Sequence, residues 1–154
     1  IDHNNIKLLD FLLSIKAPVN ADFGAYGNPV VHAVSRHNVN AVRALVKHGA
    51  DVNTYAFRDQ SLLAWAYAVS SGPETGETLL SLGADVDYLA IPSSRKTVLM
   101  FLLSYKTLDL KKIRSVIKHD SDLQIRDAEG RSSFDYFIAR RAELRALGFR
   151  DDEP

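Results

Sequence analysis

The sequence contains no cysteine, no excess of basic over acidic residues and no long apolar run. Without cysteine the chain can form neither a disulfide nor a thiolate metal site, and it has no cysteine nucleophile. Lysine plus arginine number 19 and aspartate plus glutamate number 19, so the basic excess typical of nucleic-acid binding is missing. No apolar run reaches the roughly 18 residues that a membrane-spanning helix needs. We therefore expect no nucleic-acid partner and no membrane span.

The common catalytic motifs are missing as well. There is no glycine-rich nucleotide loop, no Gly-x-Ser-x-Gly and no His-Glu-x-x-His. None of the five histidines lies three or four residues from another, so none forms the pair that a metal site on one helix requires. We expect that the protein is not an enzyme and has no cofactor and no metal site.

The composition is ordinary for a globular protein, with 46% hydrophobic and 25% charged residues among 154. A chain of this length can bury a substantial core in one domain. It begins with Ile1 instead of methionine and shows no signal peptide. We therefore expect it to be part of a longer protein that has further domains.

A short segment recurs along the chain. Gly49-Ala50-Asp51-Val52-Asn53 is repeated as Gly83-Ala84-Asp85-Val86-Asp87, and degenerate copies occupy residues 16–20 and 120–124. The last positions of successive copies are 33, 34 and 37 residues apart. A period of this length predicts a repeat architecture.

Apolar residues at helical spacing predict two helices for each repeat. One precedes each copy of the recurring segment, at residues 8–13, 42–46, 79–82 and 113–117; the other lies at 28–33, 61–66, 97–102 and 132–137. Glycine at 49 and 83 suits a left-handed turn after a helix. Lys16 and Asp120 replace it in the outer copies, so we expect those turns to be strained or differently shaped. Residues 142–147 predict a closing helix whose polar face comes from Arg140, Arg141, Arg145 and Arg150.

The period, the Gly-Ala-Asp-Val segments and Asn28-Pro29-Val30-Val31-His32-Ala33 together resemble the ankyrin repeat family over roughly residues 6–140. Asp127-Ala128-Glu129-Gly130 matches the hairpin turn of that family. The resemblance implies an all-α repeat solenoid of stacked helix-turn-helix ankyrin repeats with short β-hairpin fingers. It implies a single domain over residues 1–154, with a partial repeat at 1–20, full repeats at 21–53, 54–87 and 88–124, and a C-terminal capping repeat at 125–154.

The resemblance also implies a protein–protein interaction module that binds another protein through its concave groove and fingers. The fingers are unusually aromatic, and aromatic and arginine side chains dominate interface energetics. Two alternatives stay open: the rings could stack across neighbouring fingers, and the indole at position 65 could pack between repeats. The predicted partner-binding residues are Phe23, Tyr26, Arg36, Tyr55, Phe57, Arg58, Trp65, Ile91, Arg95 and Tyr105.

Two other functions remain open. Leu45 lies eight residues before Asn53, and Asp51-Val52 precede it directly. This resembles the context in which ankyrin asparagines are hydroxylated, so Asn53 could be a substrate of an asparaginyl hydroxylase. The chain could also be a structural module that packs on flanking domains of its own protein. The family implies an intracellular location, either as a cytoplasmic scaffold or, for a secreted bacterial effector, in the host cytoplasm.

Overall fold

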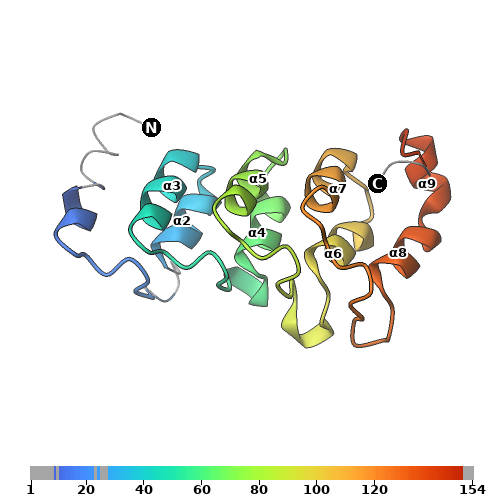
Figure 1. The fold of residues 1–154 in the computed structure, drawn as a ribbon, viewed down its shortest axis with the longest axis horizontal. Coiled ribbons are helices and arrows are strands. Elements are labelled where there is room, and N and C mark those ends of the chain that lie inside the picture. The colour runs from blue at the N-terminus through green and yellow to red at the C-terminus, as the bar shows by residue number, and fades with distance from the viewer. Residues whose placement is uncertain (1–8, 10, 23, 25–27, 151–154) are drawn as a thin grey trace. The chain divides into compact units, whose positions relative to one another are not determined.

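The computed structural model describes residues 9, 11–22, 24 and 28–150, which form helices joined by loops (Figure 1). The chain divides into two compact units, Ile1–Ala84 and Asp85–Pro154. The helices of unit 1 are α2 (Pro29–Ser35), α3 (Val39–Lys47), η2 (Phe57–Asp59), α4 (Leu62–Val69) and α5 (Glu74–Ser81). Those of unit 2 are η3 (Pro92–Ser94), α6 (Val98–Ser104), α7 (Leu110–Ile117), α8 (Ser133–Ala139) and α9 (Arg141–Ala146).

The first helix of each predicted pair begins where the sequence places a capping residue. In α2, α4, α6 and α8 the side-chain oxygen of the N-cap accepts a hydrogen bond from the backbone N–H three residues later. Pro29 follows its cap at the first helical position, where its missing N–H costs no hydrogen bond. The capping residues are Asn28, Ser61, Thr97 and Ser132.

The turns after the second helices are left-handed, as predicted. Gly49 and Gly83 have φ values of 91° and 92°. Lys16 and Asp120, which replace glycine in the outer copies, have φ values of 63° and 56°. A side chain in this region costs roughly 1–2 kcal/mol. Of the two expectations for these turns, the strained one is therefore correct.

The finger prediction needs a correction. The three fingers whose backbone is fully described are loops that each close with one isolated antiparallel bridge, and the described residues contain no β-strand. The three bridges join Tyr55 to Ser61, Ile91 to Lys96 and Arg126 to Ser132. Each loop is only a few residues long and a 3-10 helix or tight turn occupies its tip in place of a ladder.

The core of unit 1 lies between two layers of helices. Helix α2 packs on α3 and α4, and α5 packs on α3 and α4. Helix α4 is apolar nearly all round and is buried along most of its length. The Tyr67 ring packs so closely on α5 that a Cβ atom on Gly76 would overlap it. Glycine in this helix is thus required by a close approach between helices.

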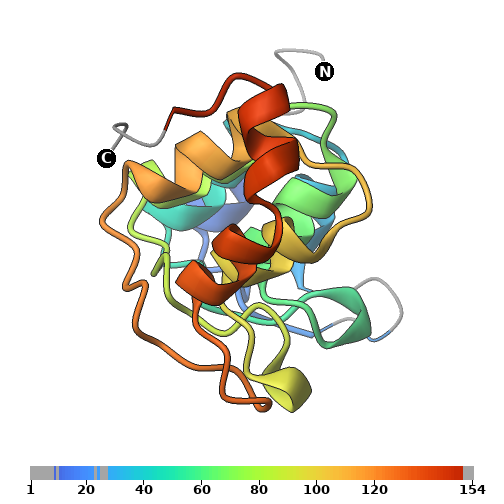
Figure 2. The ribbon, with the colours of Figure 1, turned by 90° about the vertical axis from the view of Figure 1, so that its right-hand side faces the viewer.

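In unit 2, α6 packs on both α7 and α8. All of α6 except its last residue is buried. Two of its finger loops, at η3 and at residues 126–132, lie side by side (Figure 2), and Ala128 N–H donates to the Ser94 carbonyl at 2.9 Å. No helix in the described part of the chain is long and apolar enough to cross a membrane.

The C-terminal helix was predicted to carry a polar closing face, and this is correct only in part. Arg140 is half-buried, and its guanidinium donates to the carbonyls of Leu103, Tyr105 and Lys106 at 3.1, 2.8 and 3.2 Å. It therefore supplies donors to the C-terminal end of α6, where helical carbonyls lack partners. Apolar side chains remain on this side of unit 2 as well: Phe134 is 57% exposed and Ile138 50%.

Candidate functional site

The finger at residues 54–62 of unit 1 contains the exposed predicted binding residue Tyr55. Its base is closed by hydrogen bonds from Leu62 N–H to the Thr54 carbonyl at 2.8 Å and from Ala56 N–H to the Gln60 carbonyl at 2.7 Å. The loop is therefore held in one conformation by its own backbone. Tyr55, in the bridge at its base, is 39% exposed.

An aromatic contact joins this finger to the helix that follows it. The rings of Phe57 and Trp65 meet edge to face, with centroids 5.3 Å apart and planes at 71°. The Trp65 indole N–H donates to the Ser35 hydroxyl at 2.9 Å, which links α4 to α2. The indole is thus packed between repeats, as one alternative predicted. Phe57 packs on a helix in its own repeat.

A polar pocket of about 310 Å³ adjoins this finger. Among the described residues that line this pocket, Asp22 is the one with a charged side chain. Its side chain accepts a hydrogen bond from Gly24 N–H at 2.9 Å. Carboxylate and amide oxygens at this wall can accept hydrogen bonds from a basic or amide group of a partner. The pocket is lined by Asn20, Asp22, Gly24, Asn28, Thr54, Tyr55, Ala56 and Phe57; we call these residues together with Trp65 the finger face.

The remaining predicted residues lie elsewhere. In unit 1 Arg36 is exposed at the C-cap of α2, the backbone of Arg58 lies in η2, and Phe23 and Tyr26 fall outside the described residues. In unit 2 Ile91 and Arg95 share one finger, where Arg95 is exposed and has a φ of 53°.

Tyr105, at the C-cap of α6, is 39% exposed and stacks edge to face on Phe101 with centroids 4.9 Å apart. The structure therefore brings Tyr55, Phe57 and Trp65 together in unit 1. It places Ile91, Arg95 and Tyr105 in unit 2, and their role in binding stays a prediction.

The recurring Gly-Ala-Asp-Val-Asn segment has a role that the sequence did not reveal. The Asn20 side chain donates to the Gly49 carbonyl and accepts from Asp51 N–H, both at 2.9 Å. The Asp87 carboxylate likewise accepts from Asp122 N–H at 2.9 Å. The last residue of one copy thus bonds to the backbone of the next. The polar residue at this position in successive copies could have indicated such a ladder.

The finger at residues 126–132 contains a buried charge that sequence reasoning missed. Asp127 is 5% exposed and accepts five hydrogen bonds: two from the backbone N–H groups of Glu129 and Arg131, two from the Arg131 guanidinium and one from the Tyr136 hydroxyl at 2.7 Å. Two cations lie over the Tyr136 ring, Lys96 Nζ at 5.3 Å and the Arg131 guanidinium carbon at 4.8 Å from its centroid.

These contacts set the charge of the cluster. Burial on its own would raise the pKa of Asp127, but the hydrogen bonds from Tyr136, Arg131 and Glu129 outweigh it and lower the pKa to about 2. Burial and the adjoining Asp127 carboxylate raise the pKa of Tyr136 to about 12. The cluster therefore keeps its charges near neutral pH and acts as a rigid support for the finger. Over the described ranges no three histidine, aspartate or glutamate side chains are grouped to hold a metal ion.

A family model for ankyrin repeats, in three copies, matches residues 1–90, which is more than half of the 154-residue chain. No curated protein matches the chain.

Proposed function

Because the chain belongs to the ankyrin repeat family, whose repeats are generally protein–protein interaction modules, we propose that it binds a partner protein through the finger face of unit 1. The observation that carries the proposal is the combination of an exposed Tyr55 with a preformed polar pocket at its side. Tyrosine combines a large apolar ring with a hydroxyl, which suits the centre of an interface. The partner segment places an apolar surface on Tyr55 and a hydrogen-bond donor against Asp22.

Phe57 and Trp65 have a supporting role in this proposal. The edge-to-face contact and the bond to Ser35 hold them in place before a partner arrives. A surface that is already ordered loses little conformational entropy on binding, and this favours affinity. The other predicted residues, among them Arg36 in unit 1 and Ile91, Arg95 and Tyr105 in unit 2, contribute further contacts if the partner is long enough to reach them.

The experiment begins with a photo-reactive amino acid at position 55, which captures whatever protein contacts the finger face in extracts of the source cells. The captured protein is then titrated against the unmodified chain, Tyr55→Ala and Leu147→Ala. Leu147 is 49% exposed in unit 2 and is not one of the finger-face residues, so it controls for loss of an exposed apolar side chain. We expect Tyr55→Ala to weaken binding about tenfold or more. Equal affinities for all three proteins would place the binding site elsewhere.

A second candidate is favoured by the exposed apolar residues at 11–15, of which 11–14 are helical. Phe11, Leu12 and Ile15 are 60%, 42% and 61% exposed. Exposed apolar clusters of this kind mark surfaces that another segment covers. In this candidate the chain is a structural module that packs on flanking domains of a longer protein, such as a cytoplasmic scaffold or a bacterial effector in its host. Hydrogen exchange on the longer protein tests it: slower exchange of residues 11–15 than in this chain supports the packing, and equal rates argue against it.

Modification of Asn53 is a separate proposal. Asn53 is half-buried, and its backbone N–H donates to the Asp51 carboxylate at 2.8 Å. A hydroxyl group on its side chain has to fit this turn. Mass spectrometry of the peptide that contains Asn53, after incubation with an asparaginyl hydroxylase, tests the idea. An unmodified peptide rules it out.

A further inference from the structure

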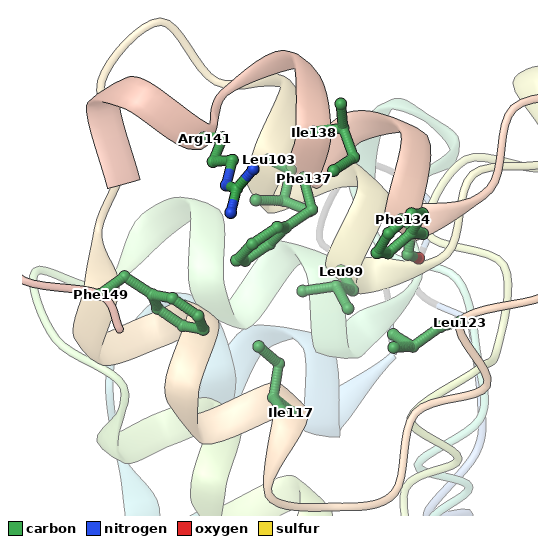
Figure 3. A pocket seen from close by; sticks show the side chains of 10 residues that line it. Leu99, Leu103, Ile117, Leu123, Phe134, Phe137, Ile138, Arg141 and Phe149 are labelled. Atoms are coloured by element: carbon green, nitrogen blue, oxygen red, sulfur yellow. The ribbon is translucent and has the colours of Figure 1, made fainter. Parts of the chain in front are cut away.

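A second pocket lies in unit 2, and its lining contains none of the residues used in the proposals above. It has a volume of about 400 Å³ and is formed by α6, α7, α8, the first residue of α9 and Phe149 (Figure 3). The lining residues are Leu99, Leu103, Ile117, Leu123, Ser133, Phe134, Phe137, Ile138, Arg141 and Phe149. We call it the C-terminal pocket.

One end of the C-terminal pocket is bounded by contacts among α7, α8 and the residues that follow α9. Phe137 and Phe149 meet edge to face at 4.9 Å, and Arg114 on α7 holds the chain beside Phe149 through a hydrogen bond to the Gly148 carbonyl at 3.2 Å. These contacts close one end of the pocket. The floor is formed by Leu99 and Leu103 of α6, which are 3% and 1% exposed. The cavity thus reaches from the surface down to the core of unit 2.

The rim of the pocket is apolar and open to solvent. Phe134 is 57% exposed, Ile138 50% and Leu123 41%. Phe134 and Ile138 are four residues apart on α8 and therefore lie on one face of the helix. A solvent-exposed apolar face beside a deep cavity is costly in a free protein and is typical of a binding site.

The polar groups of the pocket are few. Among the described residues that line it, the one with a charged side chain is Arg141, and no lining residue is acidic. Figure 3 shows the Arg141 side chain directed toward Phe137 at the rim, on the side of the pocket closed by Phe149. The wall also contains the Ser133 hydroxyl, which is buried and has no hydrogen-bond partner in the described structure. Both are donors, so the pocket is suited to a ligand that supplies oxygen acceptors.

The charge distribution selects among possible occupants. A symmetric dimer through this face would join two copies of the same lining, which contains no acidic residue to pair with Arg141. An anionic occupant meets the arginine instead with opposite charge. The volume falls within the range of small-ligand sites, about 300–1,000 Å³, and the lining has the apolar walls and few polar groups of such sites.

We propose that the C-terminal pocket binds a small amphipathic anion, a ligand with an aliphatic or aromatic body and one carboxylate. The apolar body lies against Leu99, Leu103 and Phe137, and the carboxylate pairs with Arg141 at the rim. The C-terminal pocket shares no residue with the finger face, so this proposal is tested independently of the proposed partner binding.

Decanoate is the probe, with decanol as its uncharged counterpart, and isothermal titration calorimetry on the 154-residue chain measures both. We expect saturable binding of decanoate that is at least tenfold tighter than that of decanol. Arg141→Gln is expected to remove most of this preference. The matched control is Arg145→Gln, on the same helix but outside the lining of the pocket. It is expected to leave both affinities within twofold of the unmodified chain.

Ile138→Trp blocks the mouth of the pocket, and its half-exposed position lets the larger side chain be accommodated while the fold is retained. It is expected to abolish decanoate binding with an unchanged circular dichroism spectrum. Absence of saturable binding, equal affinity for decanoate and decanol, or full binding by Ile138→Trp would each overturn the proposal. Capture of a protein that depends on Ile138, together with no decanoate binding, would assign this face to a protein partner instead.

Discussion

Asp127→Asn tests whether the buried carboxylate stabilises unit 2 by its charge. In the native protein its two oxygens accept five hydrogen bonds from groups contributed by Glu129, Arg131 and Tyr136. Asparagine has nearly the same shape but no charge, and it presents an amide N–H₂ where one oxygen was. The variant therefore removes the attraction to Arg131 and one acceptor while leaving the packing of the finger intact.

The expected magnitude follows from the pKa of Asp127. Its hydrogen-bonded environment lowers the pKa from 3.8 to about 2, and each pKa unit corresponds to about 1.4 kcal/mol of unfolding free energy. The upper bound is thus roughly 2.5 kcal/mol. Arg131 is 42% exposed, so solvent screens part of this attraction. We expect the charge to contribute about 1–2 kcal/mol at neutral pH.

The pH dependence gives the sharper test. A carboxyl group whose pKa is lower in the folded than in the unfolded chain stabilises the fold above its unfolded pKa, and this contribution is lost as the pH falls through the folded value. The difference in unfolding free energy between the native chain and Asp127→Asn should therefore be constant above about pH 5 and shrink between about pH 4 and pH 2. Carboxylates that do not interact with Asp127 titrate equally in both proteins and cancel in the difference.

Urea unfolding followed by far-ultraviolet circular dichroism at several pH values measures the difference. Glu129→Gln is the matched control: Glu129 also pairs with Arg131, at 2.7 Å, but its side chain is 68% exposed. An exposed pair of this kind contributes less than about 1 kcal/mol. A difference for Asp127→Asn that stays the same from pH 7 to pH 2 would refute the assignment of stability to the charge.

Four further substitutions test the packing and the ends of the helices, each by urea unfolding with the native chain as reference. Gly76→Ala should destabilise unit 1 by about 1–3 kcal/mol because its methyl group overlaps the Tyr67 ring, although alanine is the better helix former by about 1 kcal/mol; a stabilised variant would contradict the close approach. Ser132→Ala should lower the free energy of unfolding by about 1 kcal/mol because it removes the capping box of α8. Ser133→Ala, at the next position, should leave the stability unchanged or raise it because the buried Ser133 hydroxyl has no hydrogen-bond partner in the described structure. Equal losses of stability in the two variants would contradict this contrast. Arg140→Ala should cost about 2 kcal/mol because three carbonyls lose a charged donor, and a loss below 0.5 kcal/mol would mean that solvent replaces the guanidinium there.

Local features of this fold could be read from the sequence because they depend on neighbouring residues. The N-caps at Asn28, Ser61, Thr97 and Ser132 bond only three residues ahead, so their side chains reveal the start of each helix. Left-handed turns at Gly49 and Gly83 follow from the freedom of glycine. The strain at Lys16 and Asp120 could be anticipated on the same grounds, because the repeat register requires a left-handed residue there.

The candidate site was predicted less completely. The sequence identified Tyr55, Phe57 and Trp65 as candidate partner-binding residues, but it left open whether the finger rings bind a partner or stack between fingers, and whether Trp65 packs between repeats. The structure separates their environments: Trp65 bonds to Ser35 in the preceding repeat, Phe57 rests on Trp65, and Tyr55 remains exposed. The periodicity places all three residues but does not determine which ring covers which.

The sequence by itself determined the repeat period, the starts of the first helix of each pair, the left-handed turns and the family, because these features depend on residues close together along the chain. The second helices begin at Val39, Glu74 and Leu110, three to five residues before the expected 42, 79 and 113. Tertiary structure decided where charges and cavities lie. Arg140 reaches carbonyls some 35 residues away, and the C-terminal pocket joins residues from Leu99 to Phe149. Such contacts depend on how helices distant in sequence pack in space, and that packing is set by the sum of many side-chain contacts that no short segment contains.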